Sequence, residues 1–185
     1  MQNSAVTAEV VEPYAEALMS LAKEGNITDS IGDDVRSLMN LLKDSPELST
    51  FFASPTVKAE EKKAVIKSIA GEQINPFLLN FLLLLVDRRR ITFAQGIFAK
   101  YLEILRQLNN IVLAEVTSAV RLYEGEAERL TEKVKTLTGA TGVEIETRID
   151  PDIIGGVIIK VGSQVYDASL RGQLRRISLG MIGAN

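Results

Sequence analysis

The chain has 185 residues, 46% of them hydrophobic and 5% aromatic, which is enough for one large or two small domains with aliphatic cores. It contains no Cys, His or Trp, which excludes cysteine- and histidine-based metal sites, Ser-His-Asp and Cys-His catalysis, and disulfides. The formal net charge of −3 provides no general attraction to nucleic acid or to anionic lipid.

The first half of the chain has the hydrophobic spacing of helices. Pro13 is tolerated only near a first turn, so the first helix is expected to begin close to it. Thr28 or Asp29 is expected to cap the second helix. Helices are therefore predicted over residues 13–24, 29–42, 46–52, 58–69, 76–86 and 92–108.

The fifth predicted helix, Phe77–Val86, is apolar on nearly every side and is interrupted only by Asn80. It is much shorter than the roughly 20 residues that cross a bilayer, so it is expected inside a helix bundle. Arg88–Arg90 follow it, where positive charge favours a helix C-terminus. The mixed charges of Glu60–Lys63 are expected to form a solvated helix face.

Beyond Asn110 the spacing changes from helical to alternating. Gly162-Ser163 is a predicted hairpin turn, and Asp167 or Ser169 is expected to cap a final helix. Strands are predicted at 111–121, 143–149, 157–161 and 164–166, and helices at 124–137 and after 169. The expected fold is an all-α six-helix bundle over residues 1–109, followed by a small α+β domain over residues 110–185.

The final helix has an apolar stripe at the i, i+4, i+7 and i+11 positions. This stripe consists of Leu170, Leu174, Ile177 and Met181, with Arg171, Arg175 and Arg176 on the other side.

Nothing in the sequence predicts catalysis or a bound cofactor. Gly155-Gly156 precede a strand, whereas a phosphate-binding loop places its glycines between a strand and a helix. Asp150 and Asp152 flank Pro151, so they are expected to form a turn and not an acid–base pair. No catalytic residue, metal ligand or cofactor is therefore predicted.

Two helices carry stripes that suggest a binding groove. The first combines Tyr14 and Leu18 with small Ala17, and the fifth places Asn80 and Leu84 one turn apart. Side by side, they would form a shallow groove for the amphipathic helix of a partner. The alternative, that both stripes belong only to the core, is equally compatible with these residues.

Read together, the motifs resemble those of the F-type ATP synthase delta subunit, the oligomycin-sensitivity-conferring protein family. The resemblance covers the whole chain and is most specific from Ile149 to Leu174, including Gly155-Gly156 and Asp167-x-Ser169-x-Arg171-Gly172. The weaker motifs are Pro13-Tyr14-Ala15-x-Ala17-Leu18, Asn80-Phe81, Asp87-Arg88-Arg89-Arg90-Ile91 and Tyr101. Arg89 is a departure, since relatives often carry a small residue there.

The resemblance implies a non-catalytic stator subunit that links the catalytic head to the peripheral stalk, so that rotation couples proton flow to ATP synthesis. Its N-terminal domain would bind N-terminal helices of the alpha subunits, and its C-terminal domain would bind the b-type stalk subunits. The implied alpha-subunit contacts are Tyr14, Ala17, Leu18, Leu21, Asn80, Leu83 and Leu84. The implied stalk contacts are Leu170, Arg171, Leu174 and Arg175.

The implied location is the cytoplasmic or stromal face of a plasma or thylakoid membrane, with attachment only through the complex and no nucleic-acid partner. A competing interpretation is a free-standing helical adaptor or an RNA-binding protein that uses Arg88–Arg90. Salt-sensitive binding to RNA would favour that interpretation. An enzyme is the third possibility, and no residue pattern supports it.

Overall fold

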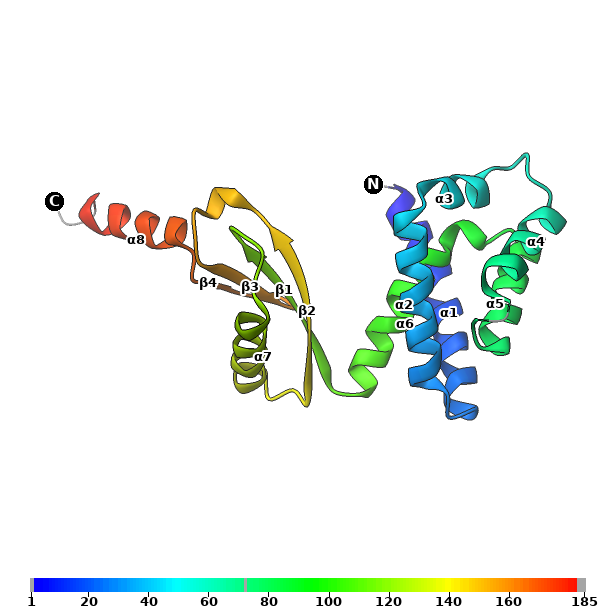
Figure 1. Cartoon of the computed structure of the whole chain (residues 1–185), viewed down its shortest axis with the longest axis horizontal. Coiled ribbons are helices and arrows are strands. Elements are labelled where there is room, and N and C mark those ends of the chain that lie inside the picture. The colour runs from blue at the N-terminus through cyan, green and yellow to red at the C-terminus, as the bar shows by residue number, and fades with distance from the viewer. Residues whose placement is uncertain (1, 72, 183–185) are drawn as a thin grey trace. The chain divides into compact units, whose positions relative to one another are not determined.

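The computed structural model describes residues 2–71 and 73–182, and the side chains of residues 9–71, 73–123 and 125–178. The chain divides into two compact units, Met1–Leu105 and Arg106–Asn185. The first unit is helical and the second combines helices with a sheet (Figure 1). The division falls within a helix, slightly before the position expected from the change in spacing.

The N-terminal unit follows the predicted order of helices (Figure 1). Pro46 begins its helix directly after Ser45, as expected for proline at a first helical position. Asn75 caps another helix, since its Oδ1 accepts a hydrogen bond from the Phe77 amide at 3.0 Å. The elements are α1 (Gln2–Glu24), α2 (Thr28–Asp44), α3 (Pro46–Ala53), α4 (Ala59–Ala70), α5 (Pro76–Asp87), the short 3₁₀ helix η1 (Ile91–Phe93) and α6 (Ala94–Leu108).

Two predicted helix starts are wrong. The α1 helix begins at Gln2 and contains Pro13, which lies on its exposed side between the buried residues Val11 and Ala15. The helix continues because burial on its inner face outweighs the backbone hydrogen bond that proline cannot make. The N-cap of α2 is Ile27, with no side-chain cap, and its side chain packs against the core.

The core of the N-terminal unit is centred on α6. Ile97, Phe98 and Tyr101 are almost completely buried there. The Tyr101 hydroxyl donates to the Thr28 carbonyl at 2.9 Å, and burial raises the pKa of Tyr101 to about 12, with a smaller effect from the negative charge of Asp29. This bond anchors the first turn of α2 to α6.

Charged residues also connect the helices of this unit. The prediction that Glu60–Lys63 form a wholly solvated face is wrong for Lys62, which is only 9% exposed. Its Nζ donates to the carbonyls of Phe52 and Ser54 at 2.6 and 2.8 Å and so holds the end of α3 against α4. Lys63 pairs with Asp87 of α5 at 2.6 Å, and this hydrogen bond raises the pKa of Lys63.

The C-terminal unit contains a four-stranded sheet with strand order β2-β1-β3-β4. The β1 strand pairs in parallel with β2 and antiparallel with β3, which pairs antiparallel with β4. The α7 helix makes the connection that parallel strands require. The elements are β1 (Ile111–Ser118), α7 (Glu124–Thr138), β2 (Gly142–Ile149), the 3₁₀ helix η2 (Pro151–Ile153), β3 (Val157–Val161), β4 (Gln164–Asp167) and α8 (Leu170–Ile182).

The small core of this unit is formed by Ala114, Val116, Val134 and Ile159. The predicted hairpin is confirmed, and Gly162 has the positive φ of +58° that its turn requires. The first predicted strand ends at Ser118 instead of Arg121, because the Ser118 hydroxyl donates to the Val120 carbonyl and turns the chain.

The β2 strand lies at the edge of the sheet, and its second half is exposed. The predicted half-burial of the whole strand is therefore correct only for its first half. Glu144 lies in that first half, where its carboxylate pairs with Arg106 at 3.0 Å.

Candidate functional site

On α1, one side of the helix faces the core and an adjacent stripe reaches the surface. Ala15 and Ala22 are completely buried, whereas Tyr14 is half-buried, Ala17 is exposed and Leu21 is 45% exposed. Positions 14, 17 and 21 have i, i+3 and i+7 spacing, which places them on one face. This face is apolar and lies next to the buried side of the helix.

A second stripe with the same spacing lies on α5. Phe77 is 55% exposed, Leu84 is 44% exposed and Asn80 lies between them at the surface. The opposite side of α5 is buried through Leu78, Leu82 and Leu85. The apolar sequence of this helix is therefore divided between core contacts and a surface stripe.

The two helices meet through an aromatic contact between Tyr14 of the first stripe and the buried Phe81 of α5. The rings of Tyr14 and Phe81 lie edge to face, with centroids 6.3 Å apart and planes at 67°. This contact places α1 beside α5. We call the combined surface the α1/α5 surface, and its residues are Tyr14, Ala17, Leu21, Phe77, Asn80 and Leu84.

Two of the expected contact residues are less accessible. Leu18 is 0% exposed, so it belongs to the core and its prediction as a surface contact is wrong. Leu83 is half-buried and packs against the core cluster. Both lie on helices that carry the α1/α5 surface, but packing turns Leu18 away from it.

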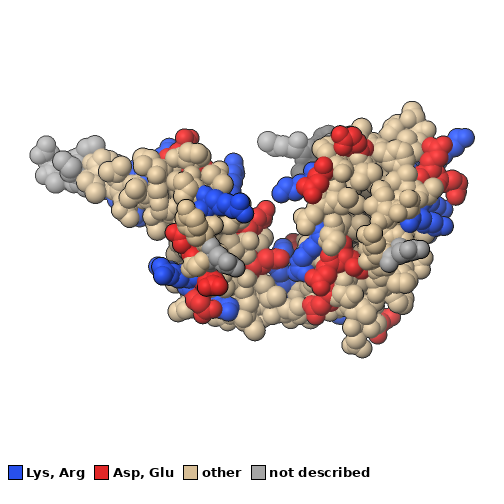
Figure 2. Space-filling model, in the orientation of Figure 1, with Lys and Arg blue, Asp and Glu red and all other residues tan. Residues whose placement is uncertain are grey.

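A second apolar surface lies on α8, which extends away from the sheet (Figure 1). Leu170 is 47% exposed, Leu174 58% and Ile177 60%. We call these three residues the α8 surface. The predicted apolar stripe is therefore present, and it is exposed to solvent instead of packed in the core. The side chain of Met181, the fourth residue of the predicted stripe, lies outside the described residues. In Figure 2 this projecting helix is largely tan, the colour of uncharged residues.

Arginines accompany the α8 surface. The side chains of Arg171, Arg175 and Arg176 are all exposed along the same helix. An apolar stripe beside positive charge suits a partner helix that combines apolar and acidic residues.

The start of α8 is held by a network of short hydrogen bonds. Ser169 is 1% exposed, and its hydroxyl accepts the Gly172 amide at 3.0 Å, which confirms it as the N-cap. The amide and hydroxyl of Ser169 both donate to Asp167 Oδ1, at 2.9 and 2.6 Å. These bonds lower the pKa of Asp167, with a further contribution from the charge of Arg176.

The three arginines after α5 form a helix end. The Arg90 amide donates to the Leu85 carbonyl at 2.7 Å and the Arg89 amide to the Val86 carbonyl at 3.0 Å. Arg89 has a φ of +55°, the left-handed position of a Schellman motif that glycine usually occupies. The Arg90 guanidinium lies 6.0 Å from the centre of the Phe93 ring. These three arginines therefore form the C-terminal cap of α5.

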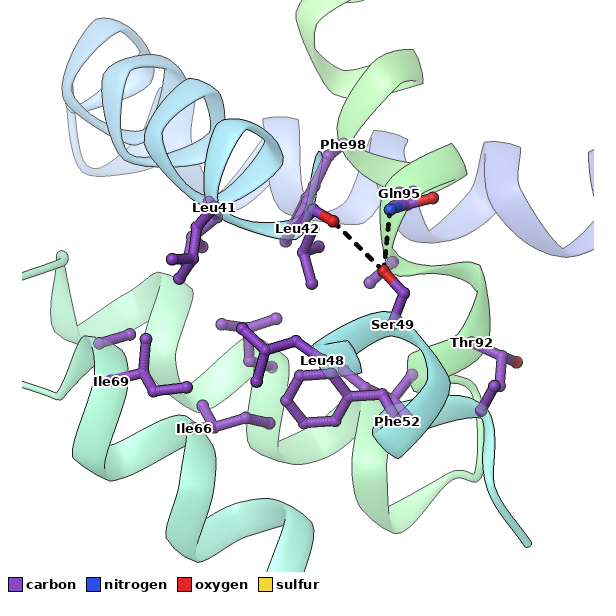
Figure 3. A pocket seen from close by; sticks show the side chains of 16 residues that line it. Leu41, Leu42, Leu48, Ser49, Phe52, Ile66, Ile69, Thr92, Gln95 and Phe98 are labelled. Carbon is purple, nitrogen blue, oxygen red and sulfur yellow. Dashed lines mark hydrogen bonds between the residues drawn. The ribbon is translucent and has the colours of Figure 1, made fainter. Parts of the chain in front are cut away.

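An apolar cavity of about 110 Å³ lies among α2 to α6. In Figure 3, Leu41 and Phe98 lie on one side of it, and Phe52 and Ile66 on the other. The Ser49 hydroxyl at its margin lies 3.4 Å from both the Leu42 carbonyl and the Gln95 amide nitrogen. No titratable side chain lines it, so it has no groups for acid–base chemistry.

The described part of the chain contains no cluster of three or more His, Cys, Asp or Glu residues arranged to hold a metal ion. Asp150 and Asp152 form the predicted turn, in which Asp150 Oδ1 accepts the Asp152 amide at 3.0 Å. No described helix combines the length and hydrophobicity needed to cross a membrane. Within the described residues, the two exposed apolar surfaces are candidates for binding a partner.

Sequence reasoning missed Phe77 and Ile154, which are 55% and 62% exposed. The spacing of Phe77 from Asn80 and Leu84 was available as a signal. Ile154 had no such signal, because its exposure depends on the turn after η2. Ile177 belongs to the predicted stripe of the final helix, although it is not one of the contacts that the resemblance implies.

Comparisons with known proteins agree with this architecture. The family model described as "ATP synthase delta (OSCP) subunit" matches residues 10–181. The chain is 55% identical to the ATP synthase subunit delta of Crocosphaera subtropica over the full length of both. It is 56% identical to that of Cyanothece sp. over 178 residues, or 96% of each chain.

Among solved structures, the chain resembles one in the mitochondrial ATP synthase hexamer of Toxoplasma gondii. The TM-score is 0.75 at 21% identity, and the match covers 94% of this chain and 97% of the other. This match supports the fold, while the family model and the relatives establish the family. The chain belongs to the ATP synthase delta (OSCP) subunit family.

Proposed function

We infer that this chain is a non-catalytic stator subunit of an F-type ATP synthase, which links the catalytic head to the peripheral stalk. The observation that carries this conclusion is the match to ATP synthase delta subunits over the full length of the chain. Two separate apolar surfaces on two compact units suit a protein that joins two larger bodies. The subunit is peripheral to the membrane complex and associates with the rest of the synthase.

For the head, we propose that α1 to α6 act as one six-helix bundle and that the α1/α5 surface binds an N-terminal helix of an alpha subunit. Leu21, Phe77 and Leu84 would supply apolar contact area, and exposed Ala17 lets another backbone approach closely. Asn80 offers a hydrogen-bonding group in the middle of this apolar surface.

For the stalk, we propose that residues 110–185 form the domain that holds b-type subunits through the α8 surface. Leu170 and Leu174 would be buried in that contact, with Arg171 and Arg175 beside them. Positive side chains at the rim favour an acidic partner and speed its association. We further propose that this contact lies on the cytoplasmic or stromal side of the membrane.

The proposed mechanism is mechanical. Rotation within the head couples to proton flow only while the outer ring is prevented from turning with it. A subunit that binds both the head and the stalk supplies that restraint, and each contact raises the effective concentration of the other. Neither contact then needs extreme affinity by itself.

The head contact is tested with Ala17→Trp in the full chain. The larger side chain should prevent close approach of the alpha-subunit helix and weaken binding to a head preparation that lacks this subunit by more than about 1 kcal/mol. Ala64→Trp is the control, because Ala64 is an exposed alanine on α4, outside the α1/α5 surface. Equal affinity of both variants and the native chain would argue against this surface.

The division of roles is tested with Leu174→Ala. This change should weaken binding to the purified stalk subunits and leave head binding unchanged, while Ala17→Trp should do the opposite. Loss of both interactions in either variant, with the fold intact, would contradict the assignment of one partner to each unit.

A further inference from the structure

Ile154 has an unusual backbone conformation. Its φ and ψ are +71° and −43°, although it is a β-branched residue. L-residues with branched side chains rarely adopt positive φ, because the side chain then crowds the neighbouring carbonyl oxygen. Its side chain is nevertheless 62% exposed, so the strain is not offset by burial in the core.

The surrounding chain forces this conformation. The preceding residue, Ile153, is 3% exposed and acts as an anchor, and the Ile154 amide donates to the Pro151 carbonyl at 3.0 Å. The Gly155 carbonyl accepts the Leu170 amide at 2.9 Å. The backbone on both sides is therefore fixed, and Ile154 takes the strained position between them.

The requirements of the fold alone would favour glycine at this position. Glycine adopts positive φ without steric cost, and it already occupies the next two positions. A β-branched apolar side chain that is strained and also exposed points to a role outside the folded unit, since backbone strain persists where function depends on it.

The location of Ile154 identifies that role. A side chain on the neighbouring Gly155 would lie 2.9 Å from Leu170 Cδ1, so this turn directly adjoins the first residue of the α8 surface. Leu174 and Ile177 continue the stripe along the helix. Ile154 therefore lies in the turn beside the start of the stripe, and its apolar side chain is exposed there.

We propose that Ile154 is a contact residue for the stalk and that the strained turn displays it as the end of the α8 surface. The occupant is an amphipathic stalk helix with acidic residues, which matches the exposed Arg171, Arg175 and Arg176. This inference rests on the proposed function. It adds a contact on a different element and a reason for the strained backbone.

The test compares stability with binding in the full chain. Ile154→Gly relieves the strain, so the C-terminal unit should unfold at a temperature about 2–6 °C higher. The same change removes the contact, so the affinity for purified stalk subunits should fall about tenfold. Ile154→Val keeps a branched apolar side chain and should bind within about threefold of the native chain.

Leu137→Ala is the matched control. Leu137 is an exposed apolar residue near the end of α7, shortly before β2 begins at Gly142. The turn with Ile154 follows Ile149, at the opposite end of β2. This variant should bind the stalk subunits with native affinity. Hydrogen exchange in the full chain assigns each change in stability to its unit.

Each outcome is decisive. Native binding by Ile154→Gly would refute the contact, and a lower unfolding temperature for that variant would refute the strain. If Leu174→Ala weakens binding but Ile154→Gly does not, only this inference fails and the proposed function stands. If the native chain does not bind stalk subunits at all, both fail together.

Discussion

Replacing Arg89 with glycine should stabilise the N-terminal unit. Arg89 occupies the left-handed position after α5, with a φ of +55°. A residue with a side chain is disfavoured there by roughly 1–2 kcal/mol, and glycine avoids this cost. Glycine also increases the conformational entropy of the unfolded chain, which offsets roughly 0.5–1 kcal/mol of this stabilisation.

The net expected gain is about 0.5–1 kcal/mol. The Arg89 side chain is exposed, so its removal sacrifices little packing. The two hydrogen bonds that close α5 use backbone amides and remain available in the variant. For a unit of this size, the gain corresponds to a rise of about 2–6 °C in unfolding temperature.

Arg88→Gly is the matched control, because it removes the same charge from the adjacent position. Arg88 has a φ of −82°, so glycine relieves no strain there and should destabilise the unit by about 0.5–1 kcal/mol. Calorimetry and hydrogen exchange on the full chain measure both variants. If Arg89→Gly is no more stable than the native chain, or if the two variants behave alike, the reasoning from backbone conformation is wrong.

Three further predictions concern other parts of the fold. Tyr101→Phe removes the donor to the Thr28 carbonyl and should lower the free energy of unfolding by about 1 kcal/mol, as measured in urea. The folded pKa of Tyr101 is raised to about 12, so the stability that its hydroxyl contributes is complete below the unfolded pKa near 10. That contribution is lost as the pH rises through about 12. Ala70→Leu fills part of the apolar cavity and should raise the unfolding temperature of the N-terminal unit by a few degrees, whereas a fall would mean that the cavity walls cannot accommodate the larger side chain. The folded pKa of Asp167 lies below its unfolded value of 3.8, so the stability that its carboxylate contributes is complete above pH 3.8 and is lost as the pH falls through the folded pKa. Hydrogen exchange of the Gly172 amide should therefore become faster in acid as the start of α8 loosens, and the Asp167→Asn variant should lack this change.

The sequence by itself determined most of the local structure of this protein. Proline at a first helical position after Ser45, the asparagine cap at Asn75 and the Gly162 turn are local features, because each depends on a few neighbouring residues. The change from helical to alternating spacing near Asn110 likewise indicated two units, and the motif from Ile149 to Leu174 indicated the family.

Only the tertiary structure decided which side of each apolar stripe is free. Leu18 and Leu21 are one turn apart on α1, yet one is completely buried and the other is 45% exposed. Hydrophobicity describes a side chain, whereas its exposure depends on which helix lies against it. Lys62 is buried and not solvated for the same reason, since carbonyls at and just after the end of α3 accept hydrogen bonds from its ammonium group.

The exposed α8 surface and the strained Ile154 also required the fold. Spacing revealed the apolar stripe of the final helix but gave no sign that it would lie open. The conformation of Ile154 depends on tertiary contacts, because the burial of Ile153 anchors one side and the Leu170 amide binds the Gly155 carbonyl on the other. Such constraints join residues that are separated in sequence, so local patterns do not contain them.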